Sequence, residues 1–167
     1  MKKTIFLLLS FFAGSQTQAQ FSATHNHTEH NLSHSFQKAY MNHPSVPKGI
    51  LEAVAWTSTR MMHLDGAEEE SCIGYPRAYS VMGLTLNGQS YFRENLKLVS
   101  NLSGVTVRDI LGDPEKSILA YAKAYELLMQ QYAGDFPSTG NLFNSKLHEA
   151  VLFQLSEIPD SGAVNAY

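Results

Sequence analysis

The residues around Asp113 and Pro114 most constrain the fold, because they mark the start of a long amphipathic helix. Aspartate is a favoured N-cap, and proline fits the first helical turn, where a missing N–H costs no hydrogen bond. Gly134 predicts that the helix ends near residue 132. The apolar residues between these signals recur at the spacing of one helical face: Ile118, Leu119, Ala122, Tyr125, Leu128, Met129 and Tyr132.

Other segments carry weaker helix signals of the same kind. Pro47 suits a first turn, Thr106 and Asn144 suit N-caps, and short loops separate the segments. No convincing pair of strands is visible. The fold class is therefore predicted to be all-α, or α with minimal β. The further helices are expected over about residues 47–62, 90–101, 106–111 and 145–157.

The segment from Pro47 is expected to bury the face formed by Ile50, Leu51, Val54, Ala55, Ser58, Met61 and Met62. Ser58 is thus predicted to point inward, and Trp56 is interpreted as core. Glu52 lies about 120° around the helix from Ser58, so it is interpreted as a solvated charge.

Residues 1–19 have the features of a signal peptide. Lys2 and Lys3 precede an apolar run over residues 5–13, and Ala19 closes a small-residue cleavage pattern. The run is too short to span a membrane, and no second segment of spanning length follows. We therefore expect export to the periplasm or medium, cleavage near Ala19 and no membrane anchor.

The rest of the chain is predicted to form one domain over residues 34–158. A polar, histidine-rich linker is expected over residues 20–33, and residues 159–167 are interpreted as the start of a further element or a truncated tail. His30 and His34 would share a helical face, but a solvated tail is favoured over a metal site. No metal or cofactor is expected.

Composition argues against nucleic-acid binding and against a cysteine nucleophile. The formal net charge of −3 becomes −5 when Lys2 and Lys3 leave with the signal peptide, which disfavours nucleic-acid binding. Cys72 is the only cysteine, so the domain has no internal disulfide, and no partner arrangement marks this residue as a nucleophile.

Three segments together resemble the soluble lytic transglycosylase and goose-type lysozyme superfamily, which cleaves the sugar backbone of peptidoglycan. In residues 46–57 the match is VPKGILEAVAWT, a helix that in this family ends in a Glu-Ser pair. Ser58 stands where the family has its acid. In residues 78–84, AYSVMGL keeps Met82 of a small-residue loop, but Ser80 replaces a glycine and Gly83 a glutamine.

The third segment, LGDPEKSILAYAKAYEL over residues 111–127, is similar to the family helix with an Asp-Pro start, and Ser117 replaces its asparagine. The chain as a whole looks closest to the amino-terminal lysozyme-like part of secreted N-acetylmuramoyl-L-alanine amidases of Bacteroidota. The resemblance implies a lysozyme-like helical domain, a peptidoglycan glycan strand as partner, and a cleft at Ser58. Its candidate glycan-binding residues are Tyr75, Tyr79, Met82, Ser117 and Tyr121.

Three functions stay open. The first is a degenerate domain that binds glycan without cleaving it, because a serine hydroxyl cannot replace the acid that such cleavage needs. The second is an active glycosidase or lytic transglycosylase whose acid has moved to the loop carboxylates Asp65, Glu68, Glu69 or Glu70, since crowded carboxylates raise one another's pKa. The third is a helical protein-interaction module. The oligomeric state is not predicted.

Overall fold

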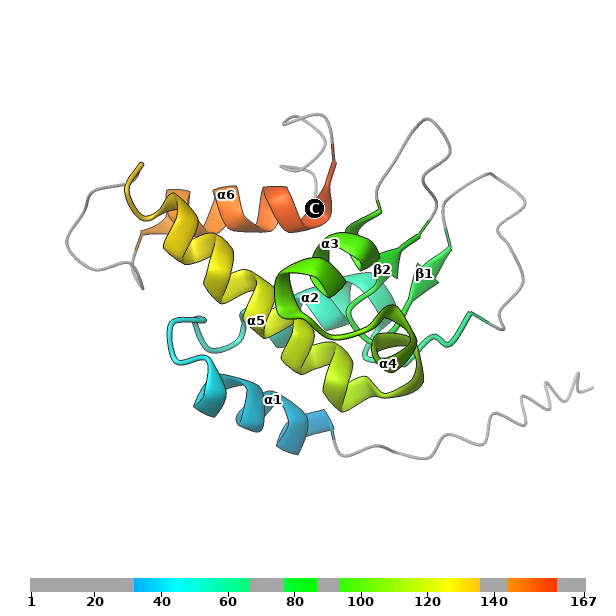
Figure 1. Cartoon of the computed structure of the whole chain (residues 1–167). Coiled ribbons are helices and arrows are strands. Elements are labelled where there is room, and N and C mark those ends of the chain that lie inside the picture. The colour runs from blue at the N-terminus through cyan, green and yellow to red at the C-terminus, as the bar shows by residue number, and fades with distance from the viewer. Residues whose placement is uncertain (1–31, 67–76, 87–93, 136–143, 159–167) are drawn as a thin grey trace, which may run out of the picture.

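The structure is a computed structural model that describes residues 32–66, 77–86, 94–135 and 144–158. These ranges contain six helices and one two-stranded sheet (Figure 1), which confirms the predicted fold class. The proposed signal peptide and residues 159–167 lie outside the described residues. Within the described part, no helix is long and apolar enough to cross a membrane. In chain order the elements are α1 (Leu32–Asn42), α2 (Ile50–Thr59), β1 (Ala78–Tyr79), β2 (Leu84–Thr85), α3 (Asn95–Ser103), α4 (Val107–Gly112), α5 (Pro114–Tyr132) and α6 (Ser145–Ser156).

Helix α5 forms the centre of the core, and α1, α3, α4 and α6 all pack against it (Figure 1). It begins at Pro114 and ends at Tyr132, as predicted. Of the expected face, Leu119 and Tyr132 are only half-buried. The buried members are Ile118, Ala122, Tyr125, Leu128 and Met129.

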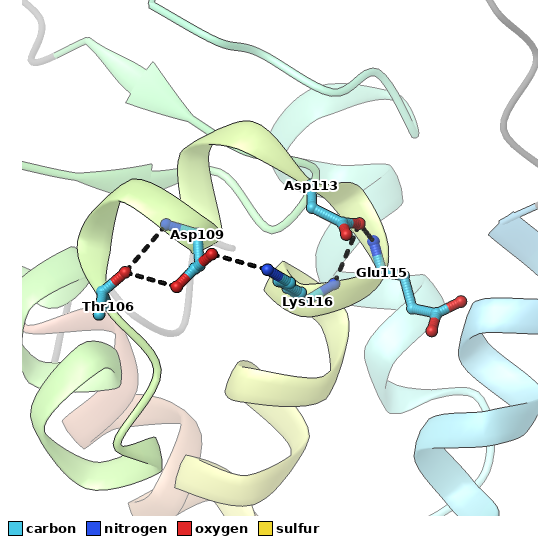
Figure 2. A network of polar contacts seen from close by, with 5 residues as sticks. All are labelled: Thr106, Asp109, Asp113, Glu115 and Lys116. Atoms are coloured by element: carbon cyan, nitrogen blue, oxygen red, sulfur yellow. Dashed lines mark hydrogen bonds and ion pairs between the residues drawn. The ribbon is translucent and has the colours of Figure 1, made fainter.

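The corner between α4 and α5 is held by side chains close in sequence (Figure 2). Thr106 accepts the N–H of Asp109, and Asp113 accepts the N–H groups of Glu115 and Lys116, so both predicted caps are confirmed. Lys116 Nζ lies 2.6 Å from Asp109 Oδ1 across the corner, and this contact lowers the pKa of Asp109. Glu115 points away from this network and pairs with Lys38 of α1.

Helix α2 is shorter than predicted. It begins at Ile50, after Gly49 in a left-handed conformation, and ends at Thr59. Arg60 and Met61 both have positive φ, so the chain leaves the helix before Met61 can extend its buried face.

The buried face of α2 is therefore also displaced. It consists of Leu51, Ala55 and Thr59, whereas Ser58 is exposed. Trp56, expected in the core, is 55% exposed. Leu51 and Ala55 are buried as predicted, but the buried face continues to Thr59, which packs against the hairpin, and not to Ser58. Trp56 lies outside this face, so the predictions for Ser58 and Trp56 were wrong.

The two-stranded hairpin was not predicted. Its strands pair antiparallel, with Ala78 opposite Thr85 and Tyr79 opposite Leu84. Two residues per strand give no alternation that a sequence pattern could reveal. The hairpin is tied to α2 by Thr59, whose hydroxyl lies 2.8 Å from the carbonyl oxygen of Val81.

The remaining helices agree with the predictions to different degrees. Helix α1 begins at Leu32, inside the segment expected to be linker, and buries Phe36 and Ala39. Helix α3 begins at Asn95, later than expected, whereas α6 begins directly after its predicted cap, Asn144.

Candidate functional site

A groove with a cavity volume of about 270 Å³ lies between α2, the hairpin and the C-terminal end of α6. Ser58 is on its rim, so the structure places a groove at the position singled out by sequence. The surrounding side chains are mostly apolar or small. The lining residues are Ala53, Val54, Thr57, Ser58, Met82, Gly83, Leu84, Asn95, Tyr121, Leu152, Leu155, Ser156 and Ile158.

The hairpin turn lies directly against α2 at this rim. Gly83 has a φ of 63°, and a Cβ atom built on it would lie 2.3 Å from the Cβ of Ser58. Any side chain at residue 83 would therefore collide with α2, in addition to the strain of the left-handed conformation. The glutamine that the resemblance places here does not fit this geometry, because the backbone of Gly83 packs directly against the side chain of Ser58.

Asn95 holds the elements around the groove together from beneath. Its Oδ1 accepts the N–H of Thr85 at 2.6 Å and lies 3.1 Å from the Thr85 hydroxyl. Its Nδ2 donates to the carbonyl oxygen of Leu155 at 3.0 Å. Because Asn95 is only 3% exposed, these bonds connect β2, α3 and α6 away from water.

The structure brings only some of the predicted site residues together. Met82 and Tyr121 line the groove beside Ser58. Ser117 is fully buried one turn before Tyr121, does not line the groove, and its hydroxyl has no hydrogen-bond partner within the described part. Tyr79 lies instead over the backbone of Gly66, where a Cβ atom would be 2.6 Å from its ring.

The loop candidates Glu68, Glu69, Glu70 and Tyr75 lie outside the described residues. Sequence reasoning also missed part of the groove wall, because Leu152, Ser156 and Ile158 come from α6 and the residues just after it, which carry no motif. Asn95 had no signal either, since its role depends on partners 10 and 60 residues away in the chain.

Glu52, expected to be a solvated charge, is instead hydrogen-bonded to the phenol of Tyr40. The Tyr40 oxygen also accepts the N–H groups of Gly49 at 2.8 Å and Leu51 at 3.2 Å. Burial, together with the Glu52 carboxylate, raises the pKa of Tyr40. The pair borders a second hollow on the α1 side of α2, so this carboxylate is committed to joining α1 and α2 and does not line the groove.

The groove offers limited chemistry. No aspartate, glutamate or histidine is among its lining residues, so the described walls provide no carboxylic acid or imidazole for acid catalysis. Within the described ranges, no group of three or more His, Cys, Asp or Glu side chains is arranged to hold a metal ion. Among the lining residues, the exposed Ser58 carries a hydroxyl suited to binding a polar ligand, whereas Tyr121 is buried in the groove floor.

Several residues near the ends of the groove walls have strained backbone conformations. The non-glycine residues with positive φ in the described part are Arg60 and Met61 after α2, Ser80 in the hairpin turn, and Glu157 between two lining residues of the α6 wall. Such conformations cost free energy and are found at functional sites more often than elsewhere.

Comparison with known proteins adds nothing to this geometry, because no family model, curated protein or solved structure matches the chain.

Proposed function

We propose that the chain is an exported, cell-wall-associated protein whose lysozyme-like domain binds the glycan strands of peptidoglycan without cleaving them. The observation that carries the proposal is the groove beside Ser58, whose described walls contain no carboxylate. Ser58 occupies the position that the family resemblance assigns to the acid, and it faces solvent at the groove rim.

The groove suits part of a sugar chain in size and lining. Its volume of about 270 Å³ is near the lower end of the roughly 300–1,000 Å³ typical of ligand pockets. Apolar walls such as Met82 and Leu152 would receive an N-acetyl methyl group or the apolar face of a pyranose ring. The exposed Ser58 would bind a hydroxyl group at its edge.

Loss of the acid has a large consequence for activity. General acid–base catalysis contributes about 10²–10⁴-fold to such reactions, and a serine hydroxyl does not donate a proton to a glycosidic oxygen at neutral pH. A binding role therefore accounts for a groove that has Ser58 in place of the catalytic acid.

The experiment uses purified peptidoglycan sacculi. Wild-type protein should co-sediment with them and release neither reducing sugar nor anhydro-sugar. Ser58→Glu should still co-sediment, since a carboxylate also binds hydroxyl groups, and recover at most weak activity, because Ser80, Gly83 and Ser117 also depart from the family pattern. Cleavage by the wild type that is lost on replacing Glu68, Glu69 and Glu70 by alanine would establish the relocated acid instead.

A matched pair of variants tests the groove itself. Thr57→Phe adds a ring at an exposed lining position, whereas Gln130→Phe adds the same ring to an exposed position of α5 that does not line the groove. Only the first should reduce co-sedimentation. If both variants and the wild type fail to bind sacculi, the hypothesis of a helical protein-interaction module replaces this proposal.

The proposed export has a separate test. Mass spectrometry of protein recovered outside the cytoplasm should show a mature chain that begins near residue 20. Material that still begins at Met1 would contradict cleavage.

A further inference from the structure

Trp56 is a large aromatic side chain on the exposed face of α2 next to the groove. It is 55% exposed, although exposure of so much apolar surface is unfavourable. Ala53 and Thr57, which both line the groove, are its neighbours on the helix. Because residues three apart on a helix have Cβ atoms about 5–6 Å apart, Trp56 lies next to Ala53, on the flank of α2 beside the face that lines the groove.

Arg60 is bonded to the backbone of Trp56, and its guanidinium contacts the indole. Its backbone N–H and its side-chain Nη1 both donate to the carbonyl oxygen of Trp56, each at 3.1 Å. Its guanidinium carbon lies 5.5 Å from the centre of the indole ring. A ring fixed in this way loses little conformational freedom when a ligand stacks on it.

We propose that Trp56 and Arg60 form a second sugar-binding subsite that continues the groove along the same glycan strand. The inference rests on the proposed function and names the residues that would extend it. The indole would stack against the apolar face of a sugar ring, and the guanidinium N–H groups not bonded to Trp56 would donate to hydroxyl or N-acetyl oxygens.

The size of the exposed feature favours a glycan over a folded protein partner. Stable protein interfaces bury about 800 Å² on each side, whereas the feature here is one exposed ring with one cation beside it. A single aromatic ring with a hydrogen-bonding neighbour matches the dimensions of one sugar.

The test compares short and long oligomers of N-acetylglucosamine by isothermal titration calorimetry. The dimer should occupy only the groove, whereas the hexamer should also reach Trp56. Trp56→Ala should weaken hexamer binding about three- to tenfold and leave dimer binding within about twofold. Arg60→Gln should weaken hexamer binding by a smaller factor. Met41→Ala removes another exposed apolar side chain, 74% exposed on α1, and should change neither affinity.

The outcomes separate the two proposals. If wild-type protein binds neither oligomer nor sacculi, the proposed function fails and the subsite fails with it. If wild-type protein binds both oligomers and Trp56→Ala weakens neither or both equally, groove binding stands and the subsite is overturned. An effect of Trp56→Ala confined to self-association, measured by sedimentation, would also overturn it and assign the tryptophan to a protein contact.

Discussion

The α4–α5 corner and the groove beside Ser58 are built by opposite means. At the corner, Thr106 and Asp113 cap helices in their preferred positions, and Lys116 pairs with Asp109 across the turn (Figure 2). At the groove, two walls end in left-handed residues that are not glycine, and a tryptophan is exposed. The corner satisfies local preferences, whereas the groove departs from them, and such departures are typical of functional or strained sites.

The residues that follow the helices show the same contrast between satisfied and strained conformations. Helix α3 is followed by Gly104 in a left-handed conformation, which glycine adopts without strain. Helices α2 and α6, which form the groove walls, are followed by Arg60 and Glu157 in the same conformation. The side chains retained there extend the surface around the groove at a cost in backbone strain.

The largest effect is expected at Asn95, beneath the groove. Asn95→Ala should lower the free energy of unfolding by about 3–5 kcal/mol, because it removes the buried hydrogen bonds of Asn95 to the N–H and hydroxyl of Thr85 and to the carbonyl oxygen of Leu155. Urea denaturation followed by circular dichroism measures the change. Asn101→Ala, at an exposed position of α3, is the matched control and should change stability by under about 0.5 kcal/mol. A loss below 1 kcal/mol at Asn95 would remove it as the connection between β2, α3 and α6.

The next effect is expected at Glu126, which joins α5 to the segment before α2. Its carboxylate lies 2.9 Å from His43 Nδ1 and accepts a hydrogen bond from the Ser45 hydroxyl at 3.0 Å. Burial alone would raise its pKa, but these hydrogen bonds outweigh burial and lower it. Glu126→Gln should reduce the free energy of unfolding by about 1–2 kcal/mol at pH 7.

The pH dependence of this effect has a defined sign. Because the folded pKa of Glu126 is lowered, the stabilisation is complete above the ordinary glutamate pKa of about 4.3 and is lost as pH falls through the folded pKa. The difference between wild type and Glu126→Gln should therefore narrow below about pH 4 in denaturation curves. A constant difference from pH 3 to pH 7 would exclude this linkage.

A smaller effect is expected at the corner. Asp113→Ala should cost about 1 kcal/mol, because two N–H groups of the first turn of α5 lose their acceptor. Asp113→Asn keeps a side-chain oxygen at the same position and should lose less. Thermal unfolding monitored at 222 nm compares the two variants, and equal losses would contradict capping as the reason.

The smallest effect is expected in the hairpin turn. Ser80 has a φ of 61°, and its hydroxyl accepts the N–H of Met82 at 3.2 Å. Ser80→Gly relieves the strain but loses this bond, so stability should change by under about 0.5 kcal/mol. Ser80→Ala loses the bond and keeps the strain, so it should be about 1 kcal/mol less stable than the glycine variant. If the alanine variant is at least as stable as the glycine variant, left-handed strain at this turn is excluded.

The sequence predicted well where one local rule decides the structure. Asp113, Pro114, Thr106 and Asn144 each carry a cap or first-turn preference, and α4, α5 and α6 start where these residues indicate. The hairpin and the buried stripe of α2 depend on packing between distant segments, so Thr59 rather than Ser58 is buried for a reason that spacing does not contain.

The candidate site was predictable only in part. The resemblance directed attention to Ser58, Met82 and Tyr121, which the structure places around one groove. It did not anticipate that Trp56 is exposed, or that Asn95 and the end of α6 complete the walls. These depend on the three-dimensional arrangement of α2, α3 and α6, for which the sequence carries no motif.

Binding of glycan in the groove is tested most directly by NMR titration of the ¹⁵N-labelled protein with the N-acetylglucosamine dimer. The amide signals of Ser58, Gly83 and Leu152 should shift progressively and saturate, while those of Lys48 and Glu52 at the hollow near Tyr40 stay unchanged. Signals that do not move at saturating sugar, or shifts confined to the hollow near Tyr40, would contradict a glycan-binding groove at Ser58.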